Sequence, residues 1–201
     1  MCRKILLAVV AAMYVPFGNI SAEEAKKPAA HGLVEVAAGK EAVLDTQLLV
    51  PVSEDISLIH RNRATWDYEG SVSIAYMLRA RHKVIGGLTA EVGAAGSSAI
   101  GLIPRAGLGY FQKMGGLKAF QVALASDSDV LSITGATYHH PVSSDLSLVV
   151  SGENTGLINR DDWLPVIQQA SIGFNYGNLE AGILGELTDG GATRGFVRGR
   201  F

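Results

Sequence analysis

Apolar and polar residues alternate along the chain from His31 to its end, in segments separated by short polar or glycine-containing breaks. Alternation with a period of two is typical of β-strands that have one apolar face, and no helical periodicity is sustained. The pattern predicts about twelve strands, over residues 32–38, 42–52, 55–66, 70–80, 83–93, 98–112, 117–126, 129–138, 144–153, 167–176, 179–187 and 193–201.

The two faces of these segments differ in a way that suggests their surroundings. One face is apolar, as in Val72, Ile74, Tyr76 and Leu78, whereas the other is rich in Gly, Ser, Ala and Arg. A soluble β-sandwich would instead turn a face rich in Lys, Glu and Thr towards water. In hydrocarbon every backbone amide must be paired within the protein, so a sheet there has to close. The sequence therefore predicts an all-β fold, a closed antiparallel transmembrane β-barrel over residues 31–201.

Segment lengths and connections fit this interpretation. A tilted transmembrane strand needs about 9–11 residues, which most segments supply. Tyrosine and tryptophan lie near segment ends, as in an interfacial girdle: Trp66, Tyr68, Tyr110, Tyr138, Trp163 and Tyr176. If both termini are periplasmic, the longest connection, 154–166, lies on the outer side.

Two stretches resist the twelve-strand scheme. Pro104 falls in the middle of a segment, where it removes a ladder hydrogen bond unless the sheet has a bulge or a discontinuity. The alanine-rich stretch 36–44 is weakly patterned, so the first two segments could be luminal and leave ten strands.

The N-terminus carries an export signal. Arg3 and Lys4 precede an apolar run that ends near Val15, and Ala22 is a small residue before a charged stretch. This is the pattern of a secretory signal peptide, and the run is too short to span a bilayer as a helix. We expect residues 1–22 to be removed and 23–30 to form a short periplasmic segment. Residues 23–201 carry 15 basic and 19 acidic side chains, a net charge near −4, which indicates no nucleic-acid partner.

The leader, the alternation and the final strand Arg194–Phe201 together resemble Gram-negative outer-membrane β-barrel proteins, over everything from His31 onward. The final strand is also similar to that of small porin-like barrels with a "GGF-x-R-x-F"-like ending, a resemblance that brings no assigned activity. The wider resemblance implies a location in the bacterial outer membrane, with outer-membrane lipid and the barrel-assembly machinery as partners. It also implies that Phe201 is part of the signal read by that machinery.

Charged residues on the polar face are expected to line the lumen, because an arginine facing lipid costs about 2–4 kcal/mol at mid-bilayer. The predicted lumen-lining residues are Arg61, Arg63, Arg79, Lys83, Glu91, Arg105, Glu153, Glu180, Glu186, Arg194, Arg198 and Arg200. A last hairpin centred near Gly190 would place Glu186 opposite Arg194 and Glu180 opposite Arg200. Arg61 and Arg63 are expected to face Asp45 and Gln47.

Catalytic and metal sites find little support in the pattern. There is no Gly-x-Ser-x-Gly elbow, no His-x-x-x-His spacing and no calcium loop. His139 and His140 are predicted to lie in a solvated periplasmic turn, His60 on the outward row, and the polar run 159–162 in a solvated loop. We therefore predict no catalytic residue, no metal and no cofactor.

Three functions remain open. The first is a small porin-like channel for small solutes, with the luminal arginines favouring anionic ones. The second is a closed structural or interaction barrel that presents the 154–166 loop. The third is an outer-membrane lipid-modifying enzyme.

Overall fold

The computed structural model describes residues 29–39, 41–99, 101–159, 162–187 and 191–201, without the side chains of residues 162–166. The predicted signal peptide and most of segment 23–30 lie outside the described residues, as does the side chain of Trp163. In the described part of the chain, no helix is long and apolar enough to cross a membrane.

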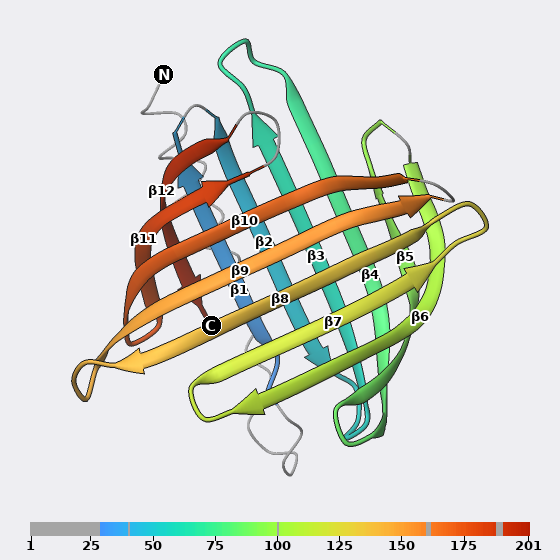
Figure 1. Cartoon of the computed structure of the whole chain (residues 1–201), viewed down its shortest axis with the longest axis horizontal. Coiled ribbons are helices and arrows are strands. Elements are labelled where there is room, and N and C mark those ends of the chain that lie inside the picture. Colours follow the sequence, from blue (N-terminus) through green and yellow to red (C-terminus); the bar gives the residue numbers. More distant parts are fainter. Residues whose placement is uncertain (1–28, 40, 100, 160–161, 188–190) are drawn as a thin grey trace.

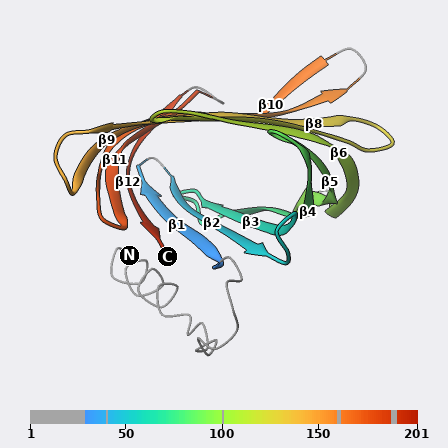
Figure 2. The same ribbon diagram turned by 90° about the horizontal axis from the view of Figure 1, so that it is seen from below.

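Twelve antiparallel strands form a closed ring, in which each strand pairs with its neighbours in sequence and β1 pairs with β12. The front wall contains β7–β10 and the back wall β1–β4 (Figure 1), and the ring is seen in cross-section in Figure 2. The strands are β1 (His31–Ala38), β2 (Ala42–Pro51), β3 (Ile56–Trp66), β4 (Val72–Ile85), β5 (Leu88–Ser97), β6 (Gly101–Met114), β7 (Leu117–Ala125), β8 (Val130–Pro141), β9 (Leu146–Asn159), β10 (Asp162–Tyr176), β11 (Leu179–Glu186) and β12 (Ala192–Arg200).

The predicted closed antiparallel barrel with about twelve strands is confirmed. The ten-strand alternative is wrong, because β1 and β2 pair with each other over eight residue pairs and belong to the wall. We call the end where β1 begins and β12 ends the terminal end, and the opposite end the distal end.

Several predicted boundaries are wrong. Strand β4 continues through Arg81 to Ile85, and the turn to β5 lies at Gly86, whose φ of +55° favours glycine. The 154–166 connection is mostly strand, because β9 pairs with β8 up to Ile158 and β10 begins at Asp162. His139 and His140 belong to β8 rather than to a turn, because they pair with Val149 and Leu148.

Pro104 lies where one side of its strand is free. It pairs with Ala94 of β5 without a shift in register, but the pairing of β6 with β7 begins only at Ala106. The discontinuity, rather than a bulge, therefore accommodates a residue that cannot donate a backbone hydrogen bond.

The outward face is apolar over most of the ring. Ile74 and Leu78 of β4, Ile172 and Phe174 of β10, and Ile183 of β11 are each at least 40% exposed. Exposure of large side chains on one continuous surface is typical of contact with lipid. Tyr110, Tyr138 and Tyr176 lie on this face towards the terminal end.

The inward face contains two apolar clusters. The larger one joins β5, β7 and β8 through Ala95, Val122, Leu124, Leu131 and Ile133, with Phe111 and Phe120 packed against it. The smaller one contains Ala37, Val43, Leu184 and Phe196. Charged side chains occupy much of the rest of the interior.

Candidate functional site: the charged barrel interior

An arginine crosses the lumen near its middle. The guanidinium of Arg61 on β3 lies 2.6 Å from the carboxylate of Asp45 on neighbouring β2 and 2.5 Å from that of Glu153 on β9. Strands β3 and β9 are not neighbours in the sheet, so the Arg61 side chain spans the interior. Thr155 also donates a 3.2 Å hydrogen bond to Glu153.

A second group of charges lies on the distal side of Arg61. Arg63 donates to Gln169 at 3.0 Å and lies 3.5 Å from Glu186. Arg194 of β12 pairs with the same Glu186, and with Glu41 at 2.7 Å. These contacts join strands β3, β10, β11 and β12 across the interior.

A third group lies towards the terminal end. Glu180, whose side chain is fully buried, accepts hydrogen bonds from Arg198 at 3.0 Å and from Arg200 at 2.5 Å. Arg198 also donates to Glu35 through Nε at 2.9 Å. These pairs connect β11 and β12 with β1, and they lie at the seam where the barrel closes.

The last hairpin has a register that differs from the prediction. Glu180 lies opposite Arg198, and Leu184 opposite Arg194, because the hairpin is centred one residue earlier than Gly190. The expected ion pairs Glu186–Arg194 and Glu180–Arg200 still form, as diagonal pairs between the strands. Across β2 and β3, Asp45 faces Arg63 and Gln47 faces Arg61, and Arg61 turns diagonally to reach Asp45.

A fourth group is local to β4 and β5. Arg79 and Arg81 lie 2.5 Å and 3.0 Å from the carboxylate of Glu91, which also accepts a 3.1 Å hydrogen bond from Thr89. The guanidinium carbon of Arg81 lies 3.8 Å from the centroid of the Phe111 ring, a cation–π geometry.

At the distal rim, Arg105 pairs with Asp129 in the turn between β7 and β8. The hydrogen bond from Arg105 lowers the pKa of the Asp129 carboxyl below its usual range, against the opposing effect of burial. Ser126 adds a 3.1 Å hydrogen bond to the same carboxylate.

The arginines and carboxylates of these groups match in number. The ion pairs formed by the described residues involve eight arginines (Arg61, Arg63, Arg79, Arg81, Arg105, Arg194, Arg198 and Arg200) and eight carboxylates (Glu35, Glu41, Asp45, Glu91, Asp129, Glu153, Glu180 and Glu186). The interior network is therefore close to neutral.

Two cavities lie in the lumen, on either side of a constriction. The one towards the terminal end has a volume of about 210 Å³ and is polar, with Glu35, Asp45 and Arg198 among its lining residues. The one towards the distal end has a volume of about 290 Å³ and is mostly apolar. Arg61, Met77 and Ile133 line both cavities, so this layer separates them.

Eleven of the twelve predicted lumen-lining residues take part in these inward groups. The exception is Lys83, which is exposed at the terminal end and donates a 2.9 Å hydrogen bond to the Glu54 carbonyl. Sequence reasoning missed Glu35 and Arg81 as luminal residues. Arg81 has the same parity as Arg79, so the pattern would have placed it in the lumen. It was missed because the predicted strand ended at residue 80, before Arg81.

The histidines do not assemble a site. His60 is opposite the exposed Leu78 on the outward face, whereas His139 has the inward parity of Ile133 on β8. No group of three potential metal-binding side chains occurs within the residues that the structure covers.

Comparison with known proteins shows a similarity of fold and not of sequence. No family model matches the chain, and no curated protein matches its sequence. The KdgM porin in complex with disordered oligogalacturonate superposes with a TM-score of 0.54 at 10% identity, covering 85% of this chain and 99% of that chain. A second structure of the KdgM porin gives a TM-score of 0.53 at 11% identity with the same coverage.

A third similar structure, the COG4313 outer membrane channel from Pseudomonas putida F1, has a TM-score of 0.49 at 10% identity and covers 90% of this chain and 99% of that chain. The likeness to the KdgM porin, together with the apolar outward surface, agrees with the predicted location in the bacterial outer membrane. The chain shares the closed antiparallel barrel fold of the KdgM porin.

Proposed function

We propose that this protein is a narrow porin-like channel of the outer membrane, in which the layer of Arg61, Met77 and Ile133 is the constriction between two luminal cavities. The observation that carries the proposal is the pair of cavities that meet at this layer inside a closed barrel. A solute would pass from one cavity to the other when the Arg61 side chain moves away from Glu153.

The polar groups of the interior support a hydrated path. The Nε atoms of Arg79, Arg105 and Arg194 are buried and have no hydrogen-bond acceptor among the described residues. Buried N–H groups of this kind are usually satisfied by water. Water in the lumen would also keep the ion pairs exchangeable, since charges in a polar medium attract one another weakly.

The near neutrality of the network bears on the solute. Eight arginines matched by eight carboxylates create little net field, so we expect at most a weak preference for anions. Reversal potentials measured across a chloride gradient in planar bilayers would give the selectivity. A strong anion preference would require positive charge beyond the paired groups described above.

Single-channel recording tests the channel itself. Folded wild-type protein should give ion current in planar bilayers, and Arg61→Ala should increase the conductance because it opens the layer between the cavities. Lys83→Ala is the matched control, since it removes one positive charge at the exposed terminal end and should leave the conductance nearly unchanged. Absence of current from protein that is folded by circular dichroism would overturn the proposal.

A second candidate function is a closed barrel that serves as an interaction protein. The observation that favours it is the filling of the lumen by ion pairs and by the apolar cluster around Val122 and Ile133. The surface it would present is the β9–β10 hairpin, which occupies the position of the predicted 154–166 loop and extends at the distal rim (Figure 2). Shortening this hairpin should then abolish partner capture without unfolding the barrel.

The third alternative, a lipid-modifying enzyme, has less support. His60 and His139 lie on opposite faces of the wall, so they cannot act on one substrate atom. A lipid-directed activity that is lost when His60, His139 and His140 are replaced together would support it.

A further inference from the structure

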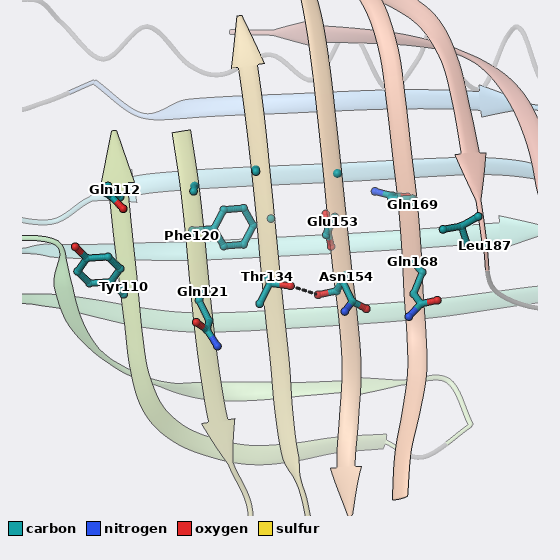
Figure 3. Close-up of a pocket in the computed structure, with 14 residues that line it drawn as sticks. Tyr110, Gln112, Phe120, Gln121, Thr134, Glu153, Asn154, Gln168, Gln169 and Leu187 are labelled. Atoms are coloured by element: carbon teal, nitrogen blue, oxygen red, sulfur yellow. Dashed lines mark hydrogen bonds between the residues drawn. The ribbon is translucent and has the colours of Figure 1, made fainter. Parts of the chain in front are cut away.

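The outward face of the front wall carries a row of polar side chains. Tyr110 of β6, Gln121 of β7, Thr134 of β8, Asn154 of β9 and Gln168 of β10 are consecutive cross-strand partners in the sheet. We call these five residues the polar row. They line a shallow outward groove of about 660 Å³ (Figure 3).

On β7 and β8, which carry two members of the polar row, the usual distribution of apolar and polar side chains is inverted. On β7 and β8 the apolar side chains Val122, Leu124 and Ile133 are buried inside the barrel, whereas Gln121 and Thr134 point outwards. On other strands many of the large outward side chains are apolar, such as Leu78 on β4 and Ile172 on β10. The outward faces of β7 and β8 around the polar row therefore differ in composition from a surface that faces acyl chains.

The polar row lies at membrane depth. Thr134 precedes Tyr138 by four residues on β8, which corresponds to about 10 Å along the membrane normal for a strand tilted by about 40°. If Tyr138 marks the interface on the terminal side, Thr134 lies well inside an apolar band about 25 Å tall. Water is scarce there, so polar groups must find partners in protein.

Apart from Thr134, the side chains of the row have no hydrogen-bond partner among the described residues. Oδ1 of Asn154 is buried and has no hydrogen-bond donor among the described residues. The only side-chain hydrogen bond that the described structure gives between members of the row is the 3.4 Å contact from Thr134 Oγ1 to the backbone carbonyl of Asn154. The side-chain amides of Gln121 and Gln168 likewise make no hydrogen bond to the described residues.

Small residues flank the row on the same face. Ala119, Ala136 and Gly152 form the next row towards the terminal end, and they line the groove. A Cβ added at Gly152 would have only one neighbouring atom within 4 Å, the Gln169 carbonyl oxygen at 3.8 Å. Small residues of this kind allow another backbone to approach closely inside a membrane.

We infer that this groove is a docking surface for a second copy of the same chain. An amide offers both a donor and an acceptor, so two identical rows satisfy one another across a twofold axis. The outward members of the row carry no formal charge, so two copies do not repel each other. With the axis along the membrane normal, the two tilted rows cross near their centre, and Thr134 lies beside its counterpart in the second copy.

Disulfide formation between copies tests the geometry. The only cysteine of the sequence is Cys2, within the predicted leader, so Thr134→Cys introduces a single thiol into the mature chain. Mild oxidation of outer membranes should convert this variant to a covalent dimer. Ile172→Cys, which is 52% exposed on the outward face of β10 but outside the groove, should stay monomeric.

A groove-filling variant tests the surface without touching the barrel. Gly152→Leu projects into the groove, and Gly195→Leu is the matched control, because a Cβ added at Gly195 on β12 has no atom within 4 Å. In analytical ultracentrifugation in mild detergent, wild-type protein and Gly195→Leu should sediment as dimers and Gly152→Leu as a monomer. Heat-modifiable migration of all three verifies that each is folded.

Three results would overturn the inference. A wild-type monomer with no disulfide at position 134 would exclude docking of a second copy. A covalent product of different mass would mean that another protein occupies the groove. A tightly held lipid, detected by mass spectrometry of the monomer and lost in Gly152→Leu, would assign the groove to a lipid instead.

Discussion

Phe201 and Gly32 join the two ends of the barrel sheet. The Gly32 amide donates to the Phe201 carbonyl at 2.7 Å, and the Phe201 amide donates back to the Gly32 carbonyl at 3.1 Å. A Cβ at position 32 would lie 2.0 Å from Cε2 of the phenylalanine ring. The ring therefore covers the glycine backbone, in the space that a side chain would fill.

Replacement of this glycine is the first prediction. Gly32→Ala should push the Phe201 ring away from β1 and lower the free energy of unfolding by about 1–3 kcal/mol, the usual cost of overpacking. Thermal denaturation in detergent, followed by circular dichroism, measures the effect. Gly195→Ala, where a Cβ meets open space, is the control, and equal stability of the two variants would contradict the prediction.

The role of Phe201 as an assembly signal stays a prediction. Phe201→Ala should reduce the amount of folded barrel in the outer membrane if the assembly machinery reads the ring. If its role is confined to covering Gly32, the variant should assemble normally and lose only stability. Heat-modifiable migration of protein extracted from membranes distinguishes the two results.

The buried carboxylate of Glu91 gives a prediction about charge balance. Glu91→Gln leaves Arg79 and Arg81 facing each other without a counter-charge, and breaking a buried ion pair in this way costs about 3–5 kcal/mol. Denaturation by guanidinium should therefore shift to lower concentration. A triple variant, Arg79→Met, Arg81→Met and Glu91→Leu, should recover much of the loss, and failure to do so would point to a role of these charges other than mutual pairing.

The lowered pKa of Asp129 leads to a prediction about how the stability of the barrel depends on pH. Its pKa is lowered in the folded barrel by the hydrogen bond from Arg105, so the folded state binds this proton less readily than the unfolded chain. The stabilisation is complete above the unfolded value, near pH 4, and is lost as the pH falls through the lower folded value. Asp129→Asn should lose stability at neutral pH and show a weaker dependence below pH 4.

Unfolding midpoints measured for both proteins over that range test the Asp129 prediction. A parallel decline of the two curves would mean that other carboxylates dominate the acid response. Ser126→Ala, which removes a smaller contribution to the same carboxylate, should give an intermediate slope.

Contact of the outward face with lipid can be tested by placing an arginine at two different depths in the bilayer. Ile172 lies within β10, four residues before its end at Tyr176, and Leu179 lies at the start of β11. They are 52% and 57% exposed on the outward face. Ile172→Arg should cost about 2–4 kcal/mol and Leu179→Arg about 0–1 kcal/mol, because an arginine near the interface reaches water. Equal effects in unfolding from lipid vesicles would contradict a bilayer around this surface.

The period-two pattern was sufficient for the fold because most strands have one strongly apolar face. It was weakest for β7, where Phe120, Val122 and Leu124 alternate with Ala119, Gln121 and Ala123, so that neither set is clearly the lipid side. The inverted polarity of β7 and β8 could be recognised only once the register had aligned Gln121 with Thr134 and Asn154.

The sequence predicted which residues face the barrel interior better than it predicted which of them form ion pairs with one another. Parity identified the arginines of the last strand, but a shift of one residue in the centre of the last hairpin changed which residues lie opposite them. The contact between Arg61 and Glu153 was beyond sequence reasoning, because it depends on how far apart two non-adjacent walls lie after closure.

The seam between β1 and β12 also dictates the order in which this chain can mature. Residues 33 and 200, partners in the seam, are separated by most of the barrel sequence, and such a distant pairing forms late and slowly. Until the final strand arrives, both outer strands expose unpaired amides that invite pairing with other chains. A chain truncated before β12 would therefore be an open template for aggregation rather than a smaller pore, and the cell must shield it or degrade it.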